Sequence, residues 1–237
     1  MWNYYGSKSK ISQYYPKPHH GKIIEPFART ARYALRYWQN EVLLVDKYEV
    51  VVKVWHWLQK CTPADIMKLP RLKKGQDITT LGLSEEETLF VGFLANIGQG
   101  TPSKTVTDFA AMQMGDDRKS KYKKVADQLH KIRHWEIRHG CYQDLQNETA
   151  TWFIDPPYQF GGEHQYKHGN KGLDFQTLAD WCQTRHGQVI VCENTKATWL
   201  PFLPMRQLQG VANSNTVEAI WTNQPTSYGA VQTKLLL

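Results

Sequence analysis

The sequence lacks the features that mark membrane, secreted and zinc-binding proteins. No apolar run approaches the roughly 18 residues that a membrane-spanning helix needs. The segment Met1 to Lys10 is polar and aromatic and has no apolar signal-peptide core. No Cys-x-x-Cys spacing occurs among the four cysteines, which are Cys61, Cys141, Cys182 and Cys192. We therefore expect reduced, partly buried thiols, no metal site and a soluble, cytoplasmic protein without a membrane partner.

The sequence also has no internal repeat and no low-complexity tract, and its 237 residues suit one α/β domain with an insertion. Positive charge is in excess: 29 Lys and Arg stand against 22 Asp and Glu, and the formal net charge is +7. Nine Trp and twelve Tyr accompany this charge. The combination favours a polyanionic partner and stacking on bases, although it also fits an ordinary basic protein with an aromatic core.

The first 60 residues predict a unit that binds nucleosides. Lys22 to Phe27 is a short apolar strand with a proline near its end, and Ala28 to Trp38 has apolar residues at helical spacing. A second apolar strand, Glu41 to Val45, ends in Asp46. An acid after the second strand of such a unit accepts hydrogen bonds from ribose hydroxyls. Because the usual phosphate-binding glycine triplet is missing, the pattern predicts a smaller adenosine-type ligand without phosphate.

The middle of the chain predicts an inserted, mostly helical subdomain at residues 60–134. It follows a helix predicted over Glu49 to Gln59, and prolines and glycines punctuate it. Ser84 and Glu87 have the spacing of a capping box in front of a helix over Glu85 to Ile97. Basic residues crowd its last third, among them Lys119, Lys121, Lys123, Lys124 and Arg133. They indicate either a solvated face or a contact with nucleic acid.

The apolar run Trp152-Phe153-Ile154 leads directly into Asp155-Pro156-Pro157-Tyr158. This pattern predicts a buried strand that stops in a rigid loop, with Asp155 held extended by the proline after it. In an open α/β sheet, ligands bind at the carboxyl ends of the strands. A simple strand terminator remains the alternative interpretation of the tetrapeptide.

The remaining chain adds further strands and one helix. Trp135 to Cys141 has alternating apolar residues, which predict a strand, and it leads to another strand-end acid, Asp144. Asp174 is a predicted N-cap for a helix that runs through His186. Gln188 to Cys192 reads as a buried strand followed by Glu193-Asn194, and Val217 to Trp221 with Val231 to Leu236 are expected to form an antiparallel edge pair.

In this order, the motifs resemble those of the phage and bacterial DNA adenine-N6 methyltransferases. The matching stretches are Tyr4 to Ile11, Ile24 to Ala34, Leu43 to Asp46, Tyr142 to Leu145, Phe153 to Tyr158 and, more loosely, Val217 to Asn223. The resemblance implies a Rossmann-like class I methyltransferase sheet with helices on both faces, formed by residues 1–59 and 135–237. Residues 60–134 match nothing in the family and would be its target-recognition insertion.

The resemblance implies S-adenosylmethionine as the cofactor and double-stranded DNA as the partner. We expect a monomeric enzyme that is associated with the bacterial nucleoid. It would be encoded by a bacterium or a phage and could belong to a restriction-modification system. The implied cofactor-binding residues are Tyr4, Lys8, Phe27, Asp46, Asp144 and Asp155. The implied catalytic residues are Asp155, Pro156 and Tyr158. DNA contacts are expected from Lys119, Lys121, Lys123, Lys124, Arg133 and the loop Gly161 to Lys171.

The residue types suit this chemistry. The amino group of adenine is a poor nucleophile because its lone pair is delocalised into the ring. The Asp155 carboxylate and the Pro156 carbonyl can each accept a hydrogen bond from it and stabilise the positive charge that grows during attack. The base must be flipped out of the duplex, and Tyr158 offers a face for stacking.

One motif departs from the family. Its cofactor loop reads Phe-x-Gly-x-Gly or Phe-x-Gly-x-Ala, whereas this chain has Phe27-Ala28-Arg29-Thr30-Ala31. The Arg29 side chain either occupies the methionine end of the pocket or pairs with the carboxylate of the cofactor, and we hypothesise weakened cofactor binding. Arg29 makes a DNA-binding protein with impaired catalysis an alternative to an active DNA enzyme. A further alternative, independent of Arg29, is an enzyme of the same fold that acts on RNA or on a glutamine side chain.

Overall fold

The computed structural model describes residues 2, 8, 11–95, 100–113, 121–161, 167, 169–209 and 215–225. The chain folds as an α/β protein around a seven-stranded mixed sheet in the order β3-β2-β1-β4-β5-β7-β6. The strands are β1 (Lys22–Glu25), β2 (Glu41–Asp46), β3 (Glu136–His139), β4 (Ala150–Ile154), β5 (Gly187–Asn194), β6 (Leu203–Gln209) and β7 (Asn215–Thr222). Pairing is parallel from β3 to β5, and β7 runs antiparallel to both β5 and β6. The predicted α/β class is confirmed.

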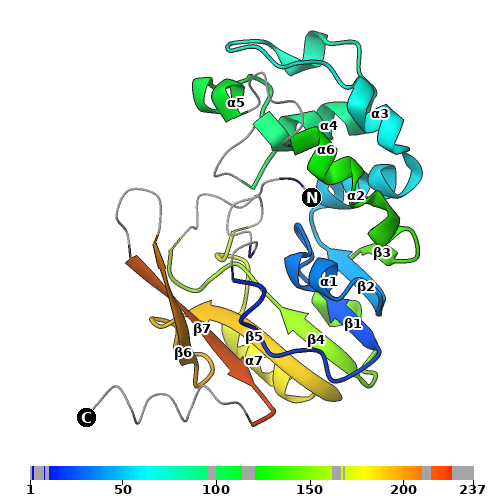
Figure 1. Cartoon of the computed structure of the whole chain (residues 1–237). Helices are drawn as coiled ribbons and strands as arrows, with labels where there is room; N and C mark the ends of the chain where they lie inside the picture. The colour runs from blue at the N-terminus through cyan, green and yellow to red at the C-terminus, as the bar shows by residue number, and fades with distance from the viewer. Residues whose placement is uncertain are drawn as a thin grey trace.

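Helices and 3-10 turns connect these strands. The helices are α1 (Arg32–Arg36), α2 (Glu49–Lys60), α3 (Pro63–Lys68), α4 (Glu85–Ala95), α5 (Asp108–Gln113), α6 (Lys121–Ala126) and α7 (Phe175–Gln183). The 3-10 turns are η1 (Ile78–Thr80), η2 (Leu129–Ile132) and η3 (Tyr142–Asp144). Helices α3 to α6 lie between β2 and β3 in the chain and gather at one end of the molecule, while β6 and β7 form the opposite edge of the sheet (Figure 1).

The sheet is covered on both faces, as the resemblance implied. Successive strand residues point to opposite faces. Leu44 belongs to the hydrophobic cluster that includes residues of α1 and α2, whereas Leu43 belongs to the cluster on α7. The inserted helices share the first cluster: the rings of Trp57 and Phe90 lie 5.1 Å apart. The insertion therefore packs on the sheet domain through a common core.

Both predicted helix caps are confirmed. The Asp174 carboxylate accepts hydrogen bonds from the backbone N–H groups of Gln176 (2.9 Å) and Thr177 (3.1 Å) at the start of α7. At the start of α4, the Ser84 hydroxyl accepts from the Glu87 N–H at 3.2 Å, and the Glu87 carboxylate accepts from the Ser84 N–H at 2.9 Å. These short side chains satisfy N–H groups that a helix leaves unpaired at its start.

The helix predicted over Ala28 to Trp38 is shorter than expected. It begins only at Arg32, because Arg29 and Ala31 have left-handed backbone angles, φ of 40° and 44°. Such residues cannot continue a right-handed helix. The buried Glu25 carboxylate accepts a hydrogen bond from the Ala34 N–H at 2.6 Å and so supports the first turn.

The edge of the sheet also differs from the prediction. The strand at Val217 to Trp221 is present as part of β7, but its partner at the edge is β6, which the sequence did not predict. The other expected edge strand, Val231 to Leu236, lies outside the described residues.

The order of the sheet creates a switch point between β1 and β4. From β1 the chain moves outward through β2 and β3, and it then returns to place β4 on the other side of β1. In doubly wound sheets, ligands bind at the carboxyl ends of the strands beside this point. Among the described residues, no helix has the length and apolar character needed to cross a membrane.

Candidate functional site

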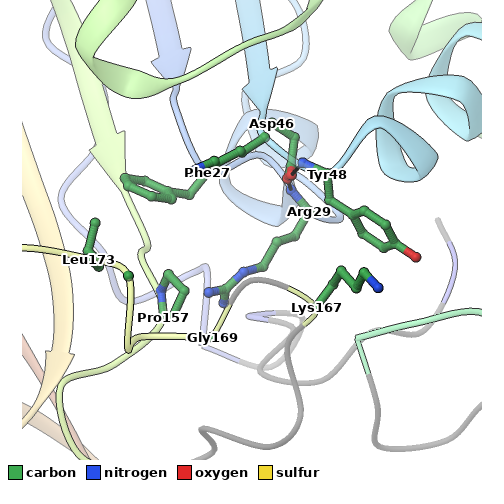
Figure 2. Close-up of a pocket in the computed structure, with 10 residues that line it drawn as sticks. Phe27, Arg29, Asp46, Tyr48, Pro157, Lys167, Gly169 and Leu173 are labelled. Atoms are coloured by element: carbon green, nitrogen blue, oxygen red, sulfur yellow. Dashed lines mark hydrogen bonds between the residues drawn. The ribbon is translucent and has the colours of Figure 1, made fainter.

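A cavity of about 260 Å³ opens at the switch point. Its walls come from the loops after β1, β2 and β4 and from the segment before α7 (Figure 2). The lining residues are Phe27, Arg29, Asp46, Lys47, Tyr48, Pro157, Lys167, Gly169, Gly172 and Leu173. The volume lies just below the usual range of small-molecule sites. Phe27 and Asp46, which the sequence assigned to one ligand, thus line the same cavity.

Backbone amides hold the Asp46 carboxylate in place. One oxygen accepts a hydrogen bond from the Arg29 N–H at 2.9 Å, and the other accepts from the Tyr48 N–H at 2.8 Å. The Val45 carbonyl accepts from the Ala28 N–H at 3.0 Å, which ties the loop after β1 to the end of β2. These bonds fix an acceptor group at the rim of the cavity.

The loop Phe27 to Ala31 has the backbone of a glycine loop without the glycines. Arg29 and Ala31, the residues at the two glycine positions of the family pattern, both have φ near +40°. A left-handed conformation costs a residue with a Cβ atom about 1 kcal/mol or more. The Arg29 carbonyl accepts a hydrogen bond from Trp55 Nε1 at 2.8 Å, which helps to hold the strained backbone. The Arg29 side chain extends into the cavity (Figure 2).

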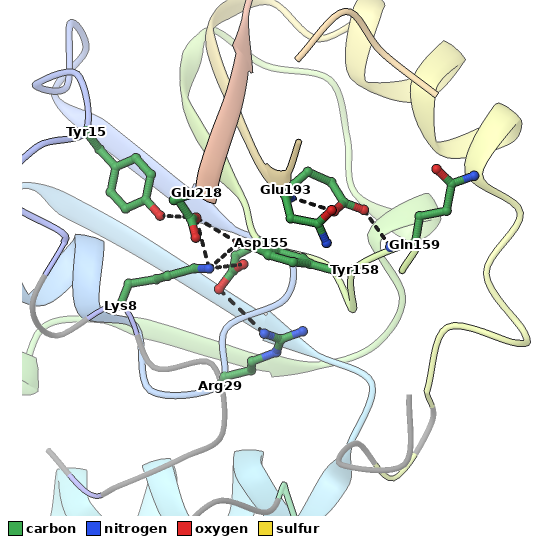
Figure 3. A network of polar contacts seen from close by, with 9 residues as sticks. Lys8, Tyr15, Arg29, Asp155, Tyr158, Gln159, Glu193 and Glu218 are labelled. Atoms are coloured by element: carbon green, nitrogen blue, oxygen red, sulfur yellow. Dashed lines mark hydrogen bonds and ion pairs between the residues drawn. The ribbon is translucent and has the colours of Figure 1, made fainter. Parts of the chain in front are cut away.

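Asp155 stands at the end of β4 as a buried carboxylate between two cations. It is 7% exposed. Lys8 Nζ lies 3.3 Å from Oδ1, and Arg29 Nη1 lies 3.5 Å from Oδ2 (Figure 3). These three residues also line a second, much smaller cavity next to the first. Arg29 lines both cavities, whereas Asp155 lines the smaller one and not the larger.

A second carboxylate, Glu218 of β7, completes a buried polar cluster. It is 3% exposed, and one oxygen lies 3.0 Å from Lys8 Nζ. The same oxygen accepts hydrogen bonds from the hydroxyls of Tyr158 (2.7 Å) and Tyr15 (2.5 Å) (Figure 3). Lys8 also donates to the Tyr158 hydroxyl. Burial, followed by the charges of Glu218 and Asp155, raises the pKa of Tyr158 well above its usual range, so this hydroxyl stays protonated.

The loop that follows Asp155 is held by β5 and by the chain before α7. The Glu193 carboxylate accepts hydrogen bonds from the Gln159 N–H (2.6 Å) and from Trp199 Nε1 (3.2 Å). Asn170 Nδ2 donates to the carbonyls of Tyr158 (3.0 Å) and Gln159 (2.9 Å). Burial raises the pKa of Glu193. The loop is therefore fixed before any ligand arrives.

Three predicted ligand residues stand apart from this cluster or are not described. The Asp144 carboxylate accepts a hydrogen bond from the Cys141 N–H at 3.1 Å in η3, and Asp144 lines neither cavity. Its neighbour Tyr142 does stack on Phe27, with ring centroids 5.5 Å apart. Tyr4 and Lys119 lie outside the described residues.

The predicted DNA contacts have mixed surroundings. Arg133 donates to the carbonyls of Leu58, Gln59 and Cys61 at the end of α2, so its guanidinium has a structural role there. Lys123 pairs with Asp127 at 2.7 Å. Burial lowers the pKa of Lys121, whereas Lys124 is exposed. A contact between these residues and DNA stays a prediction.

The sequence did not single out Glu218, Tyr15 or Glu25 as parts of the site. Glu218 carries a usable signal, because it is the one charged residue in the apolar stretch Val217 to Trp221. Glu25 is equally buried: loss of solvation, with a contribution from the charge of Asp155, raises its pKa to about 8. Tyr15 carries no such signal.

Comparison of the chain with protein-family models and with curated proteins finds no match. The function of the site therefore rests on its own geometry and on the resemblance of its motifs.

Proposed function

We propose that the protein is an S-adenosylmethionine-dependent methyltransferase that methylates the exocyclic amino group of adenine in DNA. The observation that carries the proposal is the position of Asp155. The buried residues Asp155 and Pro156 follow the strand next to the switch point, beside a cavity whose rim bears Asp46. This combination supports a site where a nucleoside-type donor and an amine acceptor meet.

The cavity suits the donor in its residue types. Asp46 offers acceptors to ribose hydroxyls, and Phe27, Pro157 and Leu173 offer apolar surface to an adenine ring. The cations Lys47 and Lys167 suit the carboxylate of the methionine part. When bound, S-adenosylmethionine supplies an electrophilic methyl group on its sulfonium.

The residues of this chain would prepare the acceptor. Asp155 and the Pro156 carbonyl accept hydrogen bonds from the amino group and stabilise the charge that develops on nitrogen. Hydrogen bonds to Glu193 and from Asn170 keep the loop after Asp155 in place, so the Pro156 carbonyl needs little reorganisation. Tyr158 fixes the base by stacking. The methylated amine loses its extra proton readily, so no strong base is required.

The sheet is consistent with a Rossmann-like fold. It is parallel from β3 to β5, and β7 runs antiparallel between β5 and β6. The net charge of +7 favours a polyanionic substrate, which is why DNA is proposed rather than a small amine.

A second candidate is a DNA-binding protein of this fold with impaired catalysis. The ion pair between Arg29 and Asp155 favours it, because the guanidinium already pairs with the carboxylate that would have to accept a hydrogen bond from the amino group. In that case the protein would bind DNA but not the methyl donor.

Calorimetric titration with S-adenosylmethionine separates the two candidates. An active enzyme binds the donor, loses affinity in the Asp46→Ala variant and transfers labelled methyl groups to DNA. An Asp155→Ala variant should retain DNA binding but lose transfer. DNA binding without any donor binding would instead favour the second candidate.

A further inference from the structure

The centre of the polar cluster is Glu218, a residue of the edge pair rather than of the loops that line the two cavities. Its carboxylate accepts from two tyrosine hydroxyls and lies 3.0 Å from the Lys8 ammonium, all on one oxygen. A carboxylate that is 3% exposed needs such partners, because a buried charge without hydrogen bonds or an opposite charge is strongly unfavourable. The cluster therefore joins β7 to Asp155, at the end of β4.

The hydrogen bonds in this cluster have defined donors and acceptors. Tyr158 stays protonated, so its hydroxyl donates to Glu218 and accepts from Lys8. An ammonium group has three donors, and among the described residues Tyr158, Glu218 and Asp155 offer acceptors to the Lys8 ammonium. Glu218 thus orients the two side chains that stand next to Asp155.

The core side of Glu218 is itself anchored. The Tyr15 hydroxyl lies 2.5 Å from the carboxylate, and the Tyr15 ring packs edge-on against Phe153 of β4 at 5.0 Å. Tyr15 lines neither cavity. The Glu218 carboxylate is therefore held by Tyr15 on the side of the core, and it also contacts Lys8 and Tyr158 beside Asp155.

We propose that Glu218 is a positioning residue, which holds Lys8 and Tyr158 in place beside Asp155 so that the carboxylate and the stacking ring meet the substrate in a fixed geometry. This inference rests on the proposed methyl transfer for its catalytic meaning. Its structural content, the hold on Lys8, can be tested without activity.

The first experiment observes the ammonium of Lys8 by side-chain ¹H–¹⁵N NMR, with Lys8→Gln to identify the signal. A held ammonium exchanges its protons slowly and gives a visible signal. Glu218→Gln should broaden or remove this signal. Tyr33→Phe, which deletes a buried hydroxyl bonded to the Pro16 carbonyl at 2.8 Å, should leave it intact. A signal that is unchanged in Glu218→Gln overturns the inference.

The second experiment is a double-variant cycle on methyl transfer, with thermal unfolding as a check on folding. Glu218→Gln and Tyr158→Phe should each lower kcat by about tenfold to a hundredfold and leave the Kd for the donor unchanged. The double variant should be no slower than the slower single variant, because both changes break one contact. Glu218→Asp, which keeps the charge, should restore part of the rate.

The two claims fail in different ways. Additive losses in the cycle would overturn the positioning role while leaving the methyltransferase intact. Absence of transfer by the wild-type protein would refute the proposed function, and the Lys8 signal would still decide whether Glu218 holds the ammonium. Were Glu218→Gln to unfold, Tyr158→Phe tests the same contact from its other end.

Discussion

Arg29 combines three features that rarely occur in one residue. Its backbone is left-handed with φ of 40°, its side chain is largely buried, and its guanidinium lies 3.5 Å from Asp155. The first feature costs stability, and the third adds a buried ion pair that a ligand near Asp155 would have to rearrange. Binding of a ligand at Asp155 therefore requires the Arg29 side chain to move.

We predict that Arg29→Gly tightens donor binding by roughly tenfold, because glycine removes the occupying side chain. The loss of the ion pair should offset the relief of strain, so thermal stability should change little. Calorimetric titration of both proteins with S-adenosylmethionine measures the effect.

Arg29→Met is the matched control, since it keeps bulk and removes charge. Tighter binding of S-adenosylmethionine by Arg29→Gly but not by Arg29→Met would show that the bulk of the Arg29 side chain in the pocket is the cause. An unchanged Kd in Arg29→Gly would contradict the prediction, and weaker binding would show that Arg29 pairs with the carboxylate of the donor.

Glu25 links stability to pH. Burial, aided by the charge of Asp155, raises its pKa from 4.5 to about 8. The folded state therefore holds a proton that the unfolded state releases. The stability that this proton contributes is complete below pH 4.5 and is lost progressively as the pH rises toward 8.

We predict that the free energy of unfolding of the wild type falls between about pH 5 and about pH 8, relative to Glu25→Gln, by on the order of 3 kcal/mol. Glutamine keeps an acceptor for the Ala34 N–H but cannot ionise. Urea unfolding at both pH values measures the difference. Glu41→Gln, a change at an exposed carboxylate, should follow the wild type, and parallel profiles for wild type and Glu25→Gln would contradict the assignment.

At the scale of elements, the pairing of β4 and β5 depends on Gly187. Its φ is +93°, and a Cβ atom there would lie 2.3 Å from the Ala150 carbonyl oxygen. Ala150 is its partner in the register of the two strands. The strand that carries Asp155 is thus aligned with its neighbour through a glycine.

Gly187→Ala should destabilise the protein by about 3 kcal/mol or more, since both the backbone angle and the overlap are unfavourable. Gly21→Ala is the control, because no atom would lie within 4 Å of its Cβ. Thermal unfolding compares the two variants. Equal melting temperatures would mean that the strands adjust without cost.

The elements that the sequence predicted are those with a strong local pattern. β1, β2, β4 and β5 contain apolar runs, and the caps at Ser84 and Asp174 are local in sequence. β6 was missed because an exposed edge strand with Pro204 and Arg206 has no apolar period. The predicted start of α1 was wrong because Arg29 and Ala31 have left-handed backbone angles, and the hydrogen bonds that hold Arg29 come from the distant residues Asp46 and Trp55.

The parts of the site at the ends of strands were predictable from the sequence. Asp155, Phe27 and Asp46 lie at or just after the ends of parallel strands, so the topology brings them to one edge of the sheet. The contact between Lys8 and Glu218 joins residues over 200 positions apart in the chain, and no local pattern reports such a pair.

At the scale of the whole molecule, the positive charge predicts a partner but not its position. Lys124 is exposed, whereas Arg133 donates to the carbonyls at the end of α2. The two residues were expected to act alike on DNA. Their surroundings now predict different effects.

We predict that Lys124→Gln weakens DNA binding equally on all sequences and lowers the slope of log K against log salt by about 1. Arg133→Gln should instead lower the melting temperature. Fluorescence anisotropy over a salt series, with thermal unfolding, measures both. A Lys124 effect confined to one sequence would contradict a phosphate contact.

The most direct test of the central claim is the product itself. DNA is incubated with the protein and S-adenosylmethionine, digested to nucleosides and analysed by mass spectrometry, with RNA as a parallel substrate. We predict N6-methyladenine in DNA from the wild type and none from Asp155→Ala. DNA without methylated adenine, from a wild-type protein that binds the donor, would contradict the assignment of Asp155 to adenine methylation.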